Sequence, residues 1–148
     1  RYFEIDKNKV IQAIEEYSPS NNRSQIIKKE NLTLILDAYN ANPSSMKEAL
    51  LNLSKFKTHK VAILGSMKEM GKYSEEEHEK LIQLGLSLNL DRIALVGKEF
   101  QAFKTKYKDC EYFTDADIAK QWFDNQNFSD ETILLKGSRA VQLEKILD

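Results

Sequence analysis

The chain has 148 residues and a formal net charge of −1 at pH 7. This near-neutral balance gives no reason to expect nucleic acid or an anionic membrane as a partner, and no stretch approaches the roughly 18 apolar residues of a membrane span. The single cysteine, Cys110, excludes a disulfide within the chain. The length suits one domain built around one hydrophobic core.

The first part of the chain predicts one helix and two paired strands. Asp6 is positioned to cap a helix over about residues 7–17. A short strand over residues 25–28 turns at Glu30 and Asn31 into the apolar strand 32–37. The two strands should pair antiparallel, because a parallel return needs a much longer crossover connection.

The rest of the chain alternates helices with apolar strands. Asn42 suits an N-cap and Pro43 suits the first helical position, so a helix should start just after the second strand. Ser74-Glu75-Glu76-Glu77 has the pattern of a capping box for another helix. The further predicted elements are strands over 61–64, 92–96, 110–113 and 132–135, a helix with Phe100 and Phe103, a helix capped by Thr114 or Asp115, and a last helix over 141–147.

This βα rhythm predicts right-handed βαβ units and a mainly parallel sheet. We expect an α/β, three-layer αβα domain with about six mainly parallel strands, one short antiparallel strand, and helices on both faces. In open α/β sheets, ligands bind at the carboxyl ends of the strands. The residues that follow the strand 32–37 are therefore the first candidates for a ligand site.

Asp37, Tyr39, Asn40 and Asn42 stand at this strand–helix junction. A carboxylate there can accept hydrogen bonds from a diol such as a ribose, but Asp is also common in turns. A phenol can stack on a purine and a carboxamide can pair with the purine edge, although both side chains could equally pack within the loop. Asn42 is explained by capping alone, by ligand binding, or by both.

A basic segment and a single arginine are candidates for binding anions. Lys136-Gly137-Ser138-Arg139 ends the last strand and opens the predicted last helix, where two cations and free backbone N–H groups could hold a carboxylate. The alternative is a plain strand-exit turn with Ser138 as N-cap. Arg23 lies in a polar loop and, judged by composition alone, would simply be solvated.

The segment after the strand 61–64 offers weaker candidates. Residues 65–72 are no P-loop, since five residues separate the glycines and Tyr73 replaces the required Ser or Thr. Glu69 could orient an incoming amine or lie on the surface. His78 could contact substrate or pack within the fold, and its separation from His59 shows no metal-ligand spacing.

Four segments together resemble, in order and spacing, the signatures of the Mur ligase family, in particular of the type that adds D-alanyl-D-alanine. The resemblance covers nearly the whole chain, but only the C-terminal domain of such enzymes. It implies a Rossmann-like fold over residues 21–148, with 1–20 as a helical lead-in from a central domain. The matching segments are Ser20-Asn21-Asn22-Arg23-Ser24, with Asn22 where many members have Gly, Asp37-Ala38-Tyr39-Asn40-Ala41-Asn42-Pro43, Leu64-Gly65-Ser66-Met67-Lys68-Glu69-Met70-Gly71, and Leu135-Lys136-Gly137-Ser138-Arg139.

The resemblance implies an ATP-dependent ligase of the bacterial cytoplasm. Such an enzyme joins D-Ala-D-Ala to UDP-MurNAc-tripeptide through an acyl phosphate in peptidoglycan biosynthesis. ATP and Mg²⁺ would be held mainly by the protein's own central domain, so this domain alone should be inactive and should bind neither tightly. The resemblance assigns residues as follows: Arg23 to the γ-phosphate as a catalytic group, Asp37, Tyr39, Asn40 and Asn42 to the nucleotide, and Lys136, Gly137, Ser138, Arg139, Glu69 and His78 to the peptide substrates.

Two other functions remain open at this point. A stand-alone Rossmann-like module for a nucleotide or small anion fits the predicted fold equally well. A sister Mur ligase that adds a different amino acid is the second alternative. The Asn40-Ala41-Asn42 segment favours the D-Ala-D-Ala type, because the sister enzymes tend to carry His there.

Overall fold

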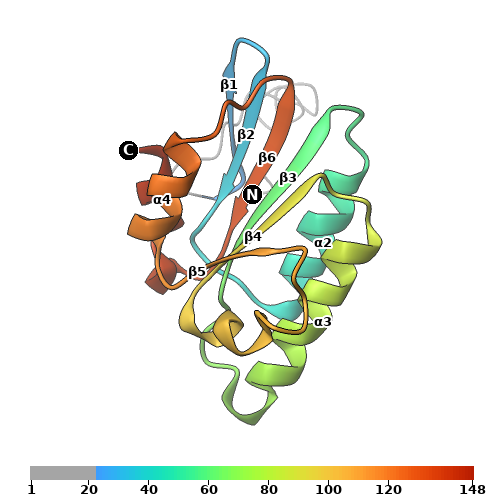
Figure 1. The fold of residues 1–148 in the computed structure, drawn as a ribbon, viewed down its shortest axis with the longest axis vertical. Coiled ribbons are helices and arrows are strands. Elements are labelled where there is room, and N and C mark those ends of the chain that lie inside the picture. Colours follow the sequence, from blue (N-terminus) through green and yellow to red (C-terminus); the bar gives the residue numbers. More distant parts are fainter. Residues whose placement is uncertain (1–22) are drawn as a thin grey trace, which may run out of the picture.

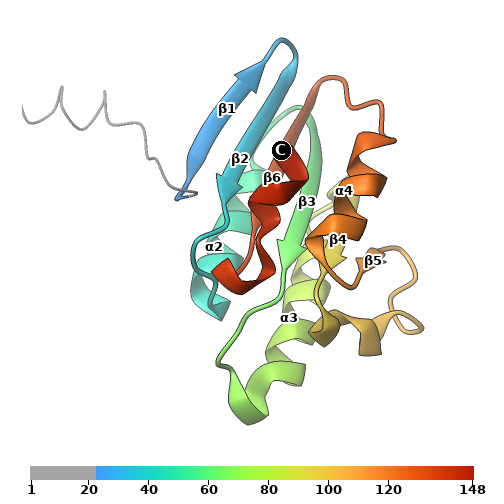
Figure 2. The ribbon, with the colours of Figure 1, turned by 90° about the vertical axis from the view of Figure 1, so that its left-hand side faces the viewer.

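A computed structural model describes residues 23–148 as one six-stranded sheet with helices on both faces (Figures 1 and 2). The helix predicted over 7–17, and the lead-in over 1–20, lie outside the described residues. The elements in chain order are β1 (Gln25–Lys29), β2 (Leu32–Asp37), α2 (Pro43–Ser54), β3 (His59–Gly65), η1 (Gly71–Tyr73), α3 (Ser74–Ser87), β4 (Arg92–Val96), η2 (Lys98–Phe103), β5 (Glu111–Phe113), α4 (Ala116–Asp124), β6 (Glu131–Lys136), η3 (Arg139–Val141) and η4 (Leu143–Leu147), where η marks a 3₁₀ helix.

The strands follow the order β1-β2-β6-β3-β4-β5 across the sheet. β1 pairs antiparallel with β2, and every other neighbouring pair is parallel. The prediction of about six mainly parallel strands with one short antiparallel strand is therefore confirmed. Because β6 inserts between β2 and β3, the last strand of the chain ends beside the second one.

Each face of the sheet has its own hydrophobic core. In β3, Ala62 and Leu64 pack with residues of α2 and α3, whereas Val61 and Ile63 pack with residues of α4 and η4. All four side chains are at most 1% exposed. The continuous apolar run of this strand thus reflects burial on both sides. Figure 1 shows α2 and α3 on one side of the sheet and α4 on the other, which confirms the three layers.

The predicted start of α2 is confirmed. Asn42 Oδ1 accepts a hydrogen bond from the Ser45 backbone N–H at 2.9 Å, and Ser45 Oγ accepts one from the Asn42 N–H at 3.2 Å. Pro43 occupies the first turn, where its missing N–H costs nothing. This reciprocal cap starts the helix only a few residues after β2 ends, and it keeps the connecting loop at the carboxyl edge of the sheet.

The predicted capping box at Ser74 is wrong. The N-cap of α3 is Tyr73, which makes no side-chain capping bond. The preceding 3₁₀ turn continues directly into α3, and the Ser74 N–H bonds to the Gly71 carbonyl within that turn. Ser74 Oγ lies instead 3.3 Å from Nδ1 of His78. A turn that already satisfies the first N–H groups removes the need for a side-chain cap.

The predicted last helix over 141–147 is also wrong, since the segment forms the two short 3₁₀ helices η3 and η4. Gln142 separates them with a left-handed φ of 56°, which no α-helix accommodates. The segment containing Phe100 and Phe103 is likewise a 3₁₀ helix, with both rings buried. Across residues 23–148, the structure shows no helix with the length and hydropathy to cross a membrane.

His78 fixes the loop between β3 and α3. Its side chain is fully buried, and Nε2 accepts a hydrogen bond from the Met67 N–H at 3.0 Å. The opposite nitrogen, Nδ1, must then carry the proton, and it donates to the Ser74 carbonyl at 2.6 Å. The ring also packs edge-to-face on Phe100. Burial lowers the pKa of His78 below its usual value, so the folded protein holds the neutral ring.

The stability of the chain should therefore fall in mildly acidic solution. The unfolded chain binds a proton at His78 below about pH 6.5, whereas the folded state resists protonation there. The free energy of unfolding should decrease between pH 7 and pH 5.5, with a slope from this residue of at most about 1.4 kcal/mol per pH unit. Urea denaturation at several pH values measures it, and His78→Gln should flatten the slope.

His59 provides the control for this measurement. It is exposed, and hydrogen bonding and charge from Asp91 raise its pKa, so its contribution is present below about pH 6.5 and is lost as pH rises. Replacing it in His59→Gln should therefore leave the acid-side loss of stability in place. An unchanged slope in His78→Gln would contradict the role assigned to the buried ring.

The N-cap of α2 gives a second stability prediction. Asn42→Ala leaves the Ser45 N–H without its side-chain acceptor, so the free energy of unfolding should fall by about 1 kcal/mol. Asn42→Ser restores an acceptor at the same position and should recover most of this loss. Urea denaturation at pH 7.5 compares the two variants, and equal stability of both would show that the cap is energetically unimportant.

Candidate functional site

The carboxyl ends of β2 and β6 carry an ion pair. Asp37 and Lys136 are register partners on these two parallel strands. Lys136 Nζ donates to Asp37 Oδ2 at 2.5 Å and to the Asn40 carbonyl at 3.2 Å. The lysine side chain is 3% exposed and that of the aspartate 22%. A residue assigned to the peptide substrate and one assigned to the nucleotide thus contact each other directly.

Asp37 also holds the start of β1. Its second carboxylate oxygen, Oδ1, accepts a hydrogen bond from the Ser24 backbone N–H at 3.3 Å. This contact places Arg23, the preceding residue, at the same edge of the sheet. One carboxylate therefore joins three segments that are distant in the sequence, and Ser24 is a contributor that sequence reasoning did not single out, because its contact is made by the backbone.

Tyr39 lies against two guanidinium groups. Arg23 Cζ is 3.9 Å from the centre of the Tyr39 ring, and Arg139 Cζ is 5.6 Å from it. Hydrogen bonding and charge from Arg23, with a smaller contribution from Arg139, lower the pKa of the tyrosine. Among residues 23–148, neither arginine forms an ion pair with a carboxylate. The ring predicted to stack on a purine is thus already contacted by arginine.

The two asparagines of the loop use their side-chain oxygens locally. Asn40 Oδ1 accepts from the Ala41 N–H at 2.9 Å, and Asn42 Oδ1 caps α2. Both side chains are exposed. Their amide N–H groups donate to no atom of the described residues 23–148, so they are available for a ligand at this edge.

The exit of β6 packs closely on the exit of β3. A Cβ atom on Gly137 would lie 2.7 Å from the Cα of Gly65, so only glycine fits there. Next to this contact, the Ser138 N–H approaches the Ser66 carbonyl at 3.4 Å. Both Gly137 and Ser138 are buried, whereas Arg139 is exposed.

The predicted helix N-terminus after β6 is not formed. The first helical segment there, η3, is a three-residue 3₁₀ helix, and Ser138 makes no side-chain capping bond to it. In the alternative interpretation Ser138 is an N-cap, and it does stand at the N-cap position of η3, although its side chain makes no capping bond. Any anion bound here would depend on the charge of Arg139 rather than on a helix dipole.

The last two predicted site residues lie apart from this cluster. Glu69 is exposed in the loop after β3, with a left-handed φ of 61°. His78 is buried beneath the same loop, so the structure gives it no surface for a substrate. An ion pair between Lys68 and Glu99 also anchors this loop. Local sequence patterns do not predict this pair, because 31 residues separate its two members.

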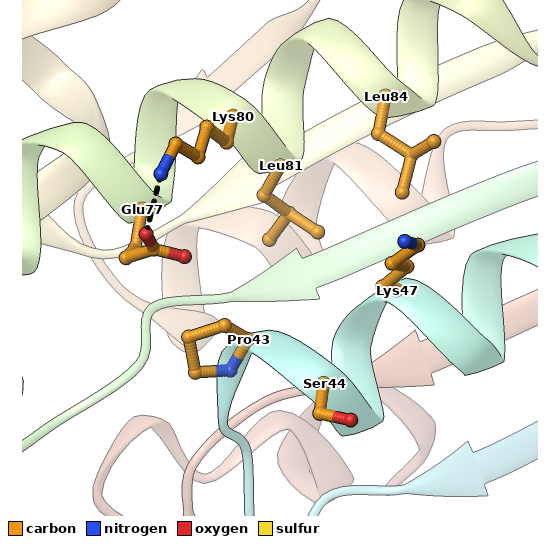
Figure 3. Close-up of a pocket in the computed structure, with 7 residues that line it drawn as sticks. All are labelled: Pro43, Ser44, Lys47, Glu77, Lys80, Leu81 and Leu84. Carbon is orange, nitrogen blue, oxygen red and sulfur yellow. Dashed lines mark hydrogen bonds and ion pairs between the residues drawn. The ribbon is translucent and has the colours of Figure 1, made fainter.

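Two hollows border α2. One, of about 310 Å³, lies between α2 and the strands β1, β2 and β6, and both Asp37 and Lys136 line it. The other, of about 480 Å³, lies between α2 and α3 (Figure 3). Its walls include Pro43, Leu81 and Leu84, and none of the predicted site residues lines it. The first hollow is therefore the one that belongs to the candidate site.

The residues present do not fit an Mg²⁺ ion. Within the described part of the chain, no group of three or more His, Cys, Asp or Glu side chains could hold a metal. The carboxylate of Asp37 is already occupied by the Lys136 ammonium and the Ser24 N–H. We accordingly assign no Mg²⁺ ligand to these residues.

Comparisons with known proteins identify relatives of this chain. The chain is 33% identical over 133 residues to the UDP-N-acetylmuramoyl-tripeptide–D-alanyl-D-alanine ligase of Borreliella burgdorferi, covering 85% of this chain and 28% of that enzyme. The corresponding ligase of Rickettsia prowazekii is 36% identical over 137 residues, covering 85% and 29%. The chain thus spans less than a third of the length of each of these two enzymes.

Solved structures and a family model point to the same family of enzymes. A crystal structure of MurF from Acinetobacter baumannii superposes with a TM-score of 0.84 at 26% identity, covering 97% of this chain and 33% of that one. MurF ligase from Thermotoga maritima, in complex with ADP, superposes with a TM-score of 0.72 at 27% identity, covering 94% and 34%. The family model described as "Mur ligase, glutamate ligase domain" matches residues 22–139. The chain therefore belongs to the Mur ligase family, in which it corresponds to the C-terminal domain of the MurF-type enzymes.

Proposed function

We propose that this chain is the C-terminal domain of a ligase that uses ATP to join D-Ala-D-Ala to UDP-MurNAc-tripeptide. The observation that carries the proposal is the cluster of Arg23, Asp37, Tyr39 and Arg139 at one sheet edge, drawn from segments that resemble signatures of the D-Ala-D-Ala-adding type. The curated relatives named above carry this activity in their names. Because the substrates are nucleotide-linked, we place the reaction in the bacterial cytoplasm.

The proposed chemistry has two steps. A carboxylate oxygen of the tripeptide attacks the γ-phosphorus of ATP, which forms an acyl phosphate and releases ADP. The amine of D-Ala-D-Ala then attacks the acyl carbon, loses a proton and expels inorganic phosphate as the amide forms. Mg²⁺ would neutralise phosphate charge, and we propose that the protein's own central domain holds it together with the phosphates.

In this scheme, Arg23 contacts the transferring phosphate. Its guanidinium is exposed at the edge, and the fork of N–H groups matches phosphate oxygens in pairs. Stacking on Tyr39 restricts the side chain before the nucleotide arrives. Arg23 would thus stabilise charge in the phosphoryl-transfer step without moving far.

The remaining assignments divide by exposure. Asp37, with the amide groups of Asn40 and Asn42, faces the nucleoside. Arg139 and Glu69 are exposed and remain candidates for the peptide substrates. The burial of His78, Gly137 and Ser138 favours structural roles for these three.

The 148-residue chain alone should form no product. Its sequence contains no P-loop to hold ATP phosphates, so phosphoryl transfer lacks its main binding site. Phosphate release should be measured with ATP, D-Ala-D-Ala and UDP-MurNAc-tripeptide, using the full-length enzyme as the positive control. Ligation by the isolated chain would refute this division of labour between domains.

Arg23→Ala in the full-length enzyme should lower kcat by about 100-fold, the order expected when one preorganised charge contact to the transition state is lost. Arg23→Lys should recover only part of this loss, because a point charge replaces the bidentate fork. Steady-state kinetics give both values.

Arg92 offers a matched control for this experiment. It lies at the amino end of β4, at the opposite edge of the sheet, and hydrogen-bonds Gln126. Arg92→Ala should leave kcat unchanged. A similar loss in both variants would show that the effect of Arg23→Ala reflects general destabilisation rather than phosphate contact.

A further inference from the structure

Lys136 is the most deeply buried charged side chain of the candidate site. It is 3% exposed at the end of β6, and two of the three N–H bonds of its ammonium group are directed to Asp37 Oδ2 and the Asn40 carbonyl. Both acceptors belong to the segment assigned to the nucleotide. A buried ammonium with these partners is poorly placed to receive the carboxylate of a peptide.

The charges of the pair are tied to each other. A buried ammonium needs a counter-ion, and Asp37 is its only ion-pair partner among the described residues. Turning Lys136 toward a peptide would therefore leave the Asp37 carboxylate without its strongest partner. The lysine is held behind the aspartate, whose side chain is the more exposed of the two.

The position of the pair in the neighbouring hollow shows where a ligand would meet it. Asp37 and Lys136 line the hollow of about 310 Å³, together with Ser45, Glu48 and Asn52 from α2. A ligand in this hollow would meet polar side chains along α2 and the Asp37 carboxylate, which Lys136 holds in place. Lys136 contacts one oxygen of the Asp37 carboxylate and the Ser24 N–H contacts the other, so the Asp37 rotamer is set before a ligand binds.

We propose that Lys136 is a positioning residue that does not bind the peptide substrate. It orients the Asp37 carboxylate and the Asn40 backbone for the nucleotide. This inference rests on the proposed function, and it changes the role that the family resemblance implies for Lys136. It requires that the lysine act on ATP binding through Asp37.

The test is a double-mutant cycle in the full-length enzyme, with Lys136→Met, Asp37→Asn and the double variant. Lys136→Met should raise the KM for ATP about tenfold, as expected for one lost charge-assisted contact, and should change the KM for D-Ala-D-Ala and for UDP-MurNAc-tripeptide less than about twofold. In the Asp37→Asn background, the same replacement should change the KM for ATP less than about twofold, because the carboxylate that transmits its effect is gone.

Two further variants guard against loss of folding. Lys136→Gln removes the charge but keeps an N–H donor, so it should raise the KM for ATP less than Lys136→Met does. Lys60→Met replaces a partly buried lysine near the start of β3, at the other end of the sheet, and should leave every KM unchanged. Thermal melting of each variant reports whether it is folded, and Lys136→Gln decides the matter if Lys136→Met does not fold.

The possible failures are distinguishable. If Lys136→Met raises the KM of a peptide substrate and leaves that of ATP unchanged, or if its effect persists in the Asp37→Asn background, the positioning role is overturned. If Asp37→Asn alone leaves the KM for ATP unchanged, the nucleotide role of Asp37 fails and the positioning role fails with it. Absence of ligase activity in the wild-type full-length protein would refute the proposed function itself.

Discussion

The ion pair between Asp37 and Lys136 is the contact on which the site depends. It exists because β6 runs parallel to β2 and ends beside it, which makes the two residues register partners. Burial of the Lys136 ammonium would cost several kcal/mol without this pairing, so the strand order and the charge arrangement support each other. The other carboxylate oxygen of Asp37 accepts a hydrogen bond from the Ser24 N–H, and this contact sets the position of the neighbouring Arg23. The strand order that defines the fold therefore also positions the residues of the candidate site.

The segments that leave β3 and β6 are held by constraints of a different kind. Gly65 and Gly137 allow the two backbones to approach more closely than any side chain would permit. After β3, His78 accepts a hydrogen bond from the Met67 N–H, and Lys68 forms an ion pair with Glu99. These two contacts anchor the loop that leads to α3. These contacts are structural, yet they determine where the exposed Glu69 stands.

Local signals predicted the local parts of this structure. The short connection before β2 predicted its antiparallel partner, and Asn42 with Pro43 predicted the start of α2, because both effects act within a few residues. The pairing of Asp37 with Lys136 spans 99 positions and follows from strand order, which periodicity does not encode. The prediction of a last helix was wrong for a related reason. The side-chain pattern there is typical of a helix, but the left-handed backbone of Gln142 interrupts it.

In the proposed reaction, the two arginines on Tyr39 would let a domain without a phosphate-binding loop contribute a charge contact to phosphate. Like charges repel, and among the described residues no carboxylate pairs with either guanidinium. Contact with the aromatic ring offsets part of that repulsion. Salt screens it further, because both arginines are exposed to solvent. An incoming anion would relieve the repulsion and gain two charged partners at once. In the proposed reaction, this edge would supply part of an anion-binding site, and the central domain would supply the rest.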